Sequence, residues 1–244
     1  MPEGRTEHIR VESVSLSAGE SVSRVSEGAE SVIVLLSGVC TLSAGGTEAT
    51  MSREGVFGAP AFAVYVPAAV EIVIAATEDT ELAWCAGMAR PGGEVVVIAP
   101  EDVKCRTVGR DTYERTVCDI VGLDVPAQHL VVGETFNQPG KWSSYPPHRH
   151  DEDRLPDEAD MEEVYLFKVD PPQGFGMQRL YSPEADFDRA VVIKDGSVVE
   201  IPEGYHPVCA APGCDLYYLW VLWGEQRILA PFDDPDFGPV KERL

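Results

Sequence analysis

The chain has 244 residues, of which 44% are hydrophobic, and its 41 acidic and 19 basic side chains give a formal net charge of −22. Such a surface repels nucleic acid and anionic lipid, so neither is an expected partner. No apolar run reaches the roughly 18 residues that a membrane span needs, and the N-terminal sequence lacks the basic-then-apolar layout of a signal peptide. The sequence therefore predicts a cytoplasmic protein without a membrane span.

Short apolar runs separated by Gly, Pro and Asp predict an all-β protein with little helix. The runs cover 31–36, 70–75, 94–98, 130–134, 190–193, 198–201 and 216–223. A hairpin turn is expected at Gly45-Gly46 and another at Asp195-Gly196, because such pairs tolerate the positive φ of a type I′ turn.

The six cysteines lie at positions 40, 85, 105, 118, 209 and 214, and none form a CxxC pair. They are scattered through apolar surroundings such as the stretch 38–42. This pattern is typical of free thiols in a reducing cytosol, and we expect all six to be free.

Three of the five histidines fall in a pattern typical of a divalent metal site. His148 and His150 share one face of a strand, because strand side chains alternate with period two. His206 follows a Pro-x-Gly turn farther along the chain. Two imidazoles on one face, met by a carboxylate and a third imidazole from neighbouring strands, suit Zn, Mn, Fe, Ni or Co.

Glu162 and Glu163 are both candidates for the carboxylate. They point to opposite faces of one strand, so only one can share the metal face, and strand alternation alone does not decide between them. We take Glu163, which shares its face with Tyr165 and Phe167. Glu162 is then expected to face away from the metal, in the barrel wall or at an interface.

A weak internal repeat divides the chain. Glu30 and Glu163 each precede an apolar run and then a proline, which lies 37 residues further on in the first half and 39 in the second. In this register Glu71 stands where His206 stands, and no His-x-His precedes Glu30. The first half is therefore predicted to lack a metal site.

Two small barrels in one chain, one of them holding a metal, make the tandem cupin (bicupin) arrangement, in which each barrel is a double-stranded β-helix. We expect an N-terminal cupin barrel without a metal site over 1–97, a bridging segment over 98–124 and a C-terminal metal-binding cupin barrel over 125–244. The mouth of such a barrel holds one small ligand.

The second half also resembles a known family. The matching stretches are 142–151 (WSSYPPHRHD), 162–165 (EEVY), 174–181 (GFGMQRLY), 204–208 (GYHPV), 210–213 (AAPG) and 217–219 (YYL). They resemble the bicupin 5-deoxy-glucuronate isomerases of myo-inositol catabolism. A sister family, the 5-keto-4-deoxyuronate isomerases, shares the ligand pattern but not the WSSYPP lead-in.

The resemblance implies that the metal ligands are His148, His150, Glu163 and His206, which favours Glu163 over Glu162. The chain departs from the family pattern at Lys141 and at Arg149, where lysine is common. Neither change touches a ligand, but both alter the charge near the mouth of the site.

The resemblance further implies an intramolecular oxidoreductase, a ketol isomerase that converts 5-deoxy-D-glucuronate to 2-deoxy-5-keto-D-gluconate. A proton leaves the carbon beside the carbonyl, and an enediol forms whose negative charge a divalent metal stabilises as a Lewis acid. Either a base moves the proton between the two carbons or a hydride shifts directly, and the sequence leaves both open.

Candidates for the remaining roles are side chains near these motifs. Arg179 and Arg227 could bind the substrate carboxylate, since a guanidinium matches it with two parallel donors. Lys141 is a candidate for catalysis and a rival for the same carboxylate. Tyr165 and Tyr205 could carry or relay a proton. A structural ion pair for Arg179 and plain packing for either tyrosine are the alternatives.

Two other functions fit the same ligand set. One is an Fe(II) cupin dioxygenase, which would differ from the isomerase in consuming oxygen. The other is a cupin that binds a sugar acid without turning it over. A small-molecule sugar acid is the expected partner of the isomerase and of the non-catalytic binding protein. An exposed sheet edge would support a homo-oligomer.

Overall fold

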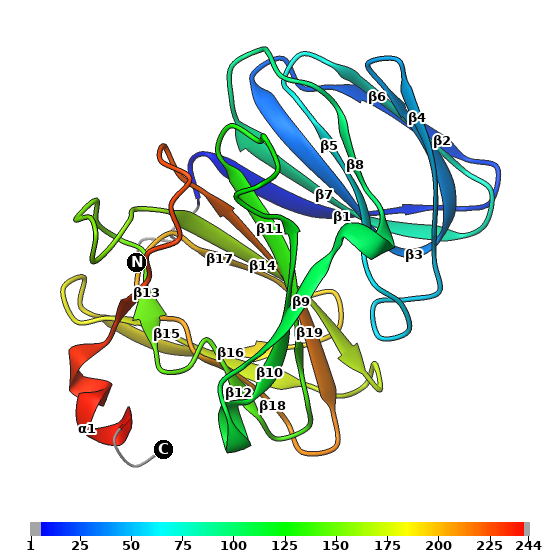
Figure 1. The fold of residues 1–244 in the computed structure, drawn as a ribbon. Coiled ribbons are helices and arrows are strands. Elements are labelled where there is room, and N and C mark those ends of the chain that lie inside the picture. The colour runs from blue at the N-terminus through cyan, green and yellow to red at the C-terminus, as the bar shows by residue number, and fades with distance from the viewer. Residues whose placement is uncertain (1–5, 242–244) are drawn as a thin grey trace.

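Two β-barrels lie side by side in the computed structural model, which describes residues 6–241 (Figure 1). The all-β fold predicted from the apolar runs is confirmed, and each of the seven runs overlaps a strand, although 70–75 and 94–98 begin one and two residues before theirs. The part of the chain that the structure describes has no helix long and apolar enough to cross a membrane.

The N-terminal barrel is one eight-stranded sheet, in which the long third strand bends and pairs with four others. Its strands are β1 (Ile9–Leu16), β2 (Ser21–Val25), β3 (Ala29–Ala44), β4 (Thr47–Arg53), β5 (Phe62–Val66), β6 (Glu71–Ala76), β7 (Thr80–Met88) and β8 (Val96–Ile98). The interior of this barrel is apolar, with side chains such as Ile33, Leu42 and Ile74 fully buried.

In the C-terminal barrel, a six-stranded sheet lies opposite a four-stranded sheet. The six-stranded sheet contains β9 (Lys104–Val108), β10 (Arg115–Val121), β11 (Leu130–Asn137), β14 (Glu162–Asp170), β17 (Val198–Ile201) and β19 (Asp215–Trp223). The four-stranded sheet contains β12 (Trp142–Ser143), β15 (Gly176–Ser182), β16 (Phe187–Ile193) and β18 (Val208–Ala210). A separate two-stranded ladder pairs β13 (His148–Arg149) with β20 (Phe232–Asp233).

The remaining elements are short helices: η1 (Pro100–Asp102), η2 (Asp111–Tyr113), η3 (Pro235–Phe237) and α1 (Gly238–Lys241). The expected bridging segment 98–124 supplies β9 and β10 to the six-stranded sheet of the C-terminal barrel. The division into domains at 97 and 125 stays a prediction.

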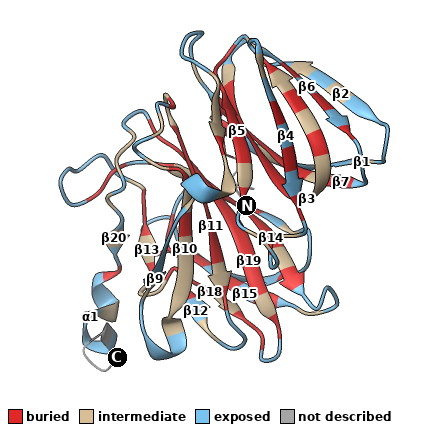
Figure 2. Ribbon diagram, turned by 45° about the vertical axis from the view of Figure 1, so that its right-hand side comes forward, coloured by how far each residue is buried: buried red, intermediate tan, exposed pale blue. Residues whose placement is uncertain are grey.

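A third apolar cluster lies between the barrels and joins them. It packs Ile9 and Val32 of the first barrel against Leu166 and Val221 of the second. Buried residues are therefore found on the strands of both barrels where the barrels meet (Figure 2). Arg53 at the end of β4 adds a buried ion pair across this junction, with one guanidinium nitrogen 3.0 and 3.1 Å from the two carboxylate oxygens of Glu134.

Each barrel contributes one glutamate that accepts backbone hydrogen bonds from the other half of the chain. The Glu30 carboxylate accepts hydrogen bonds from the backbone N–H groups of residues 128, 129 and 130 at 2.7–2.8 Å. The Glu162 carboxylate accepts them from residues 7 and 8 at 2.8–2.9 Å. Glu30 thus fastens the segment that enters β11 of the C-terminal barrel, and Glu162 fastens the segment that enters β1 of the N-terminal barrel.

This symmetry corrects the register of the internal repeat by one residue. Ser31 pairs with Val66 just before a proline, and Glu163 pairs with Ile201 just before the corresponding proline. Ser31, not Glu30, therefore stands where Glu163 stands. The off-by-one register arose because the chain carries Glu162-Glu163 where the first half has a single glutamate.

One expected hairpin is confirmed and the other is wrong. Gly45 and Gly46, with φ of 55° and 84°, join the paired strands β3 and β4. Asp195-Gly196 does form a tight turn, with the Ser197 N–H donating to the Lys194 carbonyl at 3.0 Å. The strands on either side of it pair elsewhere, however: β16 with β15 and β17 with β14. The turn carries the chain from one sheet of the barrel to the other.

The expectation of six free cysteines is also corrected. Cys105 and Cys118 lie directly opposite each other on β9 and β10 and form a disulfide, with their Cα atoms 4.0 Å apart. The sequence separation of 13 residues gave no hint of this pairing, which follows from the strand register. Cys40, Cys85, Cys209 and Cys214 are free.

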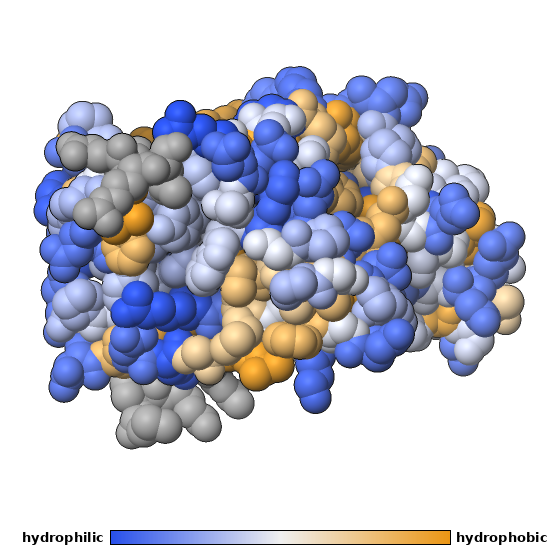
Figure 3. Space-filling view, turned by 90° about the horizontal axis from the view of Figure 1, so that it is seen from below, coloured by the Kyte–Doolittle hydropathy of each residue, from blue (hydrophilic) through white to orange (hydrophobic). Residues whose placement is uncertain are grey.

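The four-stranded sheet lies on the lower side of the molecule as drawn in Figure 1, and seen from below the surface carries apolar residues among hydrophilic ones (Figure 3). Three large apolar side chains are exposed on this sheet, those of Trp142, Met177 and Val192. They lie in one row across the strands, because Cys209 pairs with both Trp142 and Met177, and Met177 pairs with Val192. The homo-oligomer expected from the sequence stays a prediction.

Candidate metal centre and its surroundings

Three histidines and a glutamate come together in the C-terminal barrel from three separate segments. His148 lies on β13 and His150 directly follows that strand, Glu163 lies on β14, and His206 lies in the loop between β17 and β18. One ring nitrogen from each histidine lies within 4.8 Å of the others. The period-two spacing of the His-x-His pair thus places both rings on one side, with their centroids 5.3 Å apart.

Glu163 completes the cluster. Its Oε2 lies 3.0 Å from Nε2 of His206 and 3.9 Å from Nε2 of His150. Tyr165 and Phe167 share its face of β14 and pack in the barrel interior, whereas Glu162 points to the N-terminal segment. Strand alternation, given the direction of the barrel interior, therefore selects Glu163.

Buried polar atoms converge on this point without hydrogen-bond partners. They are Oε2 of Glu163 and Nε2 of His206, and Nε2 of His150 lies 3.9 Å from the same oxygen. Buried polar atoms are costly unless something satisfies them, and three imidazoles with one carboxylate are a donor set for a divalent transition metal. The residues present therefore fit the metal that the sequence implied.

The surroundings favour neutral imidazoles at two of the three histidines. Burial, with the neighbouring imidazoles, holds the pKa of His148 well below its ordinary value, and burial lowers the pKa of His150 to about 4. Burial acts in the same direction on His206, but the Glu163 carboxylate and the Gly204 carbonyl outweigh it and raise the pKa of that ring. Neutral rings are the form that binds metal.

Two tyrosine–serine pairs line the interior beside the cluster. The Tyr165 hydroxyl lies 3.0 Å from Oγ of Ser144, and its ring centroid lies 5.9 Å from that of His206. The Tyr218 hydroxyl is hydrogen-bonded to Oγ of Ser143, and the two tyrosine rings stack at 4.5 Å. Burial first, and then the Glu163 carboxylate, raise the pKa of Tyr165 well above its ordinary value, so its hydroxyl keeps its proton.

Ser144 adopts a backbone conformation that few residues with a side chain occupy, with φ of +48°. It is 4% exposed and follows Ser143, so successive residues both direct their hydroxyls to tyrosines. Such a conformation costs free energy and persists where the surroundings hold it, often at functional sites.

Gln178 and Arg179 face opposite sides of β15. Gln178 is fully buried, its amide nitrogen donates to the His206 carbonyl at 3.2 Å, and its Oε1 is buried without a hydrogen-bond partner. The Arg179 side chain is 43% exposed and makes two hydrogen bonds of 2.9 and 2.7 Å to Asp188. The arginine favoured from the sequence thus points outward, and its neighbour points in.

The other two cationic candidates lie in structural contacts. Arg227 donates to four backbone carbonyls, those of residues 122, 125, 127 and 130, at 2.6–3.1 Å. These hydrogen bonds fix the segment that enters β11, and they occupy the guanidinium of Arg227. Lys141 forms an ion pair with Glu114 at 3.1 Å. The structure brings neither side chain into contact with the histidine and glutamate cluster.

Tyr205 also points away from the ligand cluster. Its ring stacks on Tyr181 at 5.0 Å and lies below the guanidinium of Arg149, 5.5 Å from the ring centroid. Arg149 is buried among the carboxylates of Asp151, Glu158 and others, on the side of the strand opposite the two histidines.

A pocket of about 330 Å³ borders the residues that flank the ligands in sequence. Pro147, Pro207 and Arg179 line it, together with a group of aromatic side chains, those of Tyr113, Trp142, Tyr145 and Phe237. Pro147 precedes His148, and Pro207 follows His206. The pocket is lined by outward-facing side chains such as Trp142 and Arg179, and none of the four cluster residues lines it.

The sequence analysis missed three interior residues. Gln178 could have been found, because Leu180 on the same strand is apolar and alternation places Gln178 beside it inside the barrel. Ser143 and Ser144 gave no such signal, since both point inward only because of the positive φ at Ser144.

Comparison with known proteins supplies a family. The KduI/IolB family matches residues 2–240. A 5-deoxy-glucuronate isomerase of Geobacillus kaustophilus is 37% identical over 239 residues, covering 97% of this chain and 87% of the relative. That of Bacillus subtilis strain 168 is 33% identical over 242 residues, covering 97% and 89%.

Solved structures agree on the architecture. An IolB-like protein from Salmonella typhimurium superimposes with a TM-score of 0.92 at 30% identity, covering 96% of this chain and 90% of that one. An oxalate decarboxylase of Bacillus subtilis gives a TM-score of 0.63 at 11% identity, covering 90% and 70%. The second likeness concerns the fold alone and confirms the tandem cupin barrels expected from the sequence.

Proposed function

The chain belongs to the KduI/IolB family, and on that premise we propose that it is a metal-dependent ketol isomerase that converts 5-deoxy-D-glucuronate to 2-deoxy-5-keto-D-gluconate. The observation that carries the proposal is the convergence of His148, His150, Glu163 and His206, with buried donor atoms left unpaired. These four residues would hold one divalent ion.

When bound, the ion would supply positive charge to the substrate carbonyl and the neighbouring hydroxyl, where negative charge develops. The Tyr165 hydroxyl lies on the same face of β14 as Glu163 and is held by Ser144. Because this hydroxyl keeps its proton, it would donate a hydrogen bond to the substrate oxygen on which negative charge develops. Ser144 fixes the direction of that hydroxyl.

Barrel-interior groups would fix the rest of the sugar. The unpaired Oε1 of Gln178 is an acceptor for a substrate hydroxyl, and its amide nitrogen is already oriented by the His206 carbonyl. Of the three cationic candidates, Arg179 lines a surface pocket together with Pro147 and Pro207, and it remains the candidate for the carboxylate. Its surface ion pair with Asp188 is weak enough to be exchanged, since exposed pairs contribute roughly 0–1 kcal/mol.

Anaerobic turnover tests the proposal. Incubation with 5-deoxy-glucuronate, followed by NMR, is expected to show the 5-keto product without oxygen, and a chelator is expected to abolish it. Turnover that requires oxygen would instead favour the Fe(II) dioxygenase. Metal binding without turnover of this sugar would favour the non-catalytic binding protein.

A further inference from the structure

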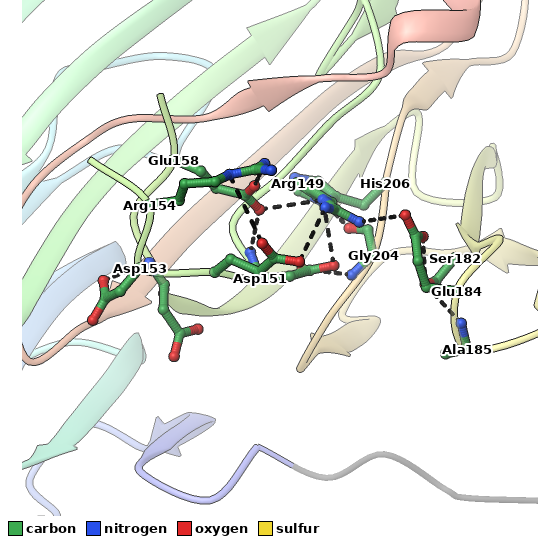
Figure 4. Close-up of polar contacts among 12 residues, drawn as sticks. Arg149, Asp151, Asp153, Arg154, Glu158, Ser182, Glu184, Ala185, Gly204 and His206 are labelled. Atoms are coloured by element: carbon green, nitrogen blue, oxygen red, sulfur yellow. Dashed lines mark hydrogen bonds and ion pairs between the residues drawn. The ribbon is translucent and has the colours of Figure 1, made fainter. Parts of the chain in front are cut away.

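A hydrogen-bonded link connects the two segments that carry the histidines. Nδ1 of His206 lies 3.0 Å from the Gly204 carbonyl oxygen, and the Gly204 N–H donates to Oδ1 of Asp151 at 2.8 Å. Asp151 directly follows His150 in the chain. The end of the His148–His150 segment is thus fastened to the loop that holds His206 (Figure 4).

The direction of these bonds fixes the protonation of one ring. A carbonyl oxygen only accepts, so Nδ1 of His206 carries the hydrogen. In the neutral ring the lone pair then lies on Nε2, which is the nitrogen 3.0 Å from Glu163. The position of the Gly204 peptide therefore sets which nitrogen of His206 is free to bind metal, and where it points.

Gly204 is tightly confined by its neighbours. Its φ is +92°, and a Cβ there would lie 2.7 Å from the Tyr181 carbonyl oxygen. Tyr205 exchanges two backbone hydrogen bonds with Tyr181, at 2.8 and 3.0 Å. The loop is thus held against β15 on one side, and Asp151 is its polar contact on the other.

Asp151 is itself held from three directions. Its N–H donates to Oε1 of Glu158 at 2.9 Å. The Arg149 guanidinium lies 3.2 Å from Glu158, 3.1 Å from Glu184 and 3.9 Å from Asp151 (Figure 4). The carboxylate that receives the Gly204 N–H is therefore ordered before any ligand binds.

We propose that Asp151 is a positioning residue for the metal centre. By accepting the Gly204 N–H it holds the Gly204 carbonyl against Nδ1 of His206, and so it presents Nε2 of that ring to the ion. The inference rests on the proposed metal centre. Partners of this kind typically change metal affinity by about 10- to 100-fold when they are removed.

The test is metal affinity, measured with Co²⁺ alone on the full chain by competition with a chromophoric chelator. The wild type is compared with Asp151→Ala, Asp151→Asn and Asp153→Ala, and circular dichroism checks the fold of each. Asp153 lies in the same acidic loop and accepts a hydrogen bond from Asp160, so its loss removes the same charge without touching Gly204.

Asp151→Ala is expected to weaken Co²⁺ binding about 10- to 100-fold and to shift the visible spectrum of the bound ion. Asp151→Asn keeps an Oδ1 acceptor and is expected to stay within about threefold of the wild type, as is Asp153→Ala. Should Asp151→Ala lose the native circular dichroism, Asp151→Leu takes its place, because it fills a similar volume without an acceptor.

Unchanged affinity and spectrum in the variant without an acceptor would overturn the proposal. Equal weakening by Asp151→Ala and Asp153→Ala would also overturn it, because loss of charge would then explain the effect. A wild type that binds no Co²⁺ would refute the proposed metal centre itself, which separates that failure from the failure of the Asp151 link.

Discussion

Replacing Tyr165 with phenylalanine removes one hydroxyl from the barrel interior and leaves the ring. The ring keeps its stacking on Tyr218 at 4.5 Å and its edge contact with Phe167 at 5.7 Å, so the variant is expected to fold. Its cost in stability is that of leaving the buried Ser144 hydroxyl without this partner, about 1–3 kcal/mol.

The effect on catalysis is expected to be larger than the effect on folding. Removing one hydrogen-bond donor to a developing oxyanion typically costs roughly 100- to 1,000-fold in rate. That range corresponds to about 2.7–4 kcal/mol in the barrier at 1.36 kcal/mol per tenfold. We therefore expect kcat for 5-deoxy-glucuronate to fall by at least 100-fold, with metal content unchanged.

The assay follows product by NMR at saturating substrate, with bound metal quantified on the same sample. Tyr218→Phe is the matched control, because it removes the other hydroxyl of the stacked pair, which contacts Ser143 instead. It is expected to keep kcat within about fivefold. Turnover in D₂O adds a second readout, since a proton moved between the carbons by a base exchanges with solvent and leaves deuterium in the product, whereas a direct hydride shift does not.

A kcat for Tyr165→Phe within threefold of the wild type would refute the role assigned to the hydroxyl. Product without solvent deuterium, together with full activity of the variant, would favour a direct hydride shift, the alternative that the sequence left open.

Three further results are expected. Replacing Arg53 with methionine leaves the Glu134 carboxylate buried and unpaired, and should lower the unfolding free energy by about 3–5 kcal/mol in denaturant titrations. The double variant Arg53→Met, Glu134→Leu should recover most of that loss, and an equal loss in both variants would contradict the pairing. Metal at 100 times its Kd should stabilise the fold by about 2.7 kcal/mol, which corresponds to a rise in Tm of about 5–11 °C over the chelated protein in calorimetry. An unchanged Tm would count against a metal site in the folded protein. Arg179→Ala should raise KM for the sugar acid with little change in metal affinity, and an unchanged KM would remove Arg179 from the substrate site.

Local pattern was enough to predict the strands and the meeting of the three histidines. Each apolar run became a strand because period-two burial and turn residues act over a few positions. The His148 and His150 spacing placed two rings together for the same reason. Even the choice of Glu163 follows from alternation once the direction of the barrel interior is known.

The parts that the sequence did not yield depend on which distant strands pair. The disulfide between Cys105 and Cys118 follows from the register of β9 and β10, and β16 and β17 enter different sheets although a tight turn joins them. The contact of Asp151 with Gly204 spans 53 residues. The spacing of residues along the chain does not predict these contacts, because they form only when the barrel brings distant segments together.

Titration of the metal-free protein with Co²⁺, with visible absorption and anaerobic turnover recorded on the same samples, decides whether the histidine and glutamate cluster is a catalytic metal site. Both signals are expected to rise together and saturate at one ion per chain, and His148→Ala is expected to abolish both while the fold remains. Turnover in the metal-free protein, or full metal binding by His148→Ala, would contradict this assignment.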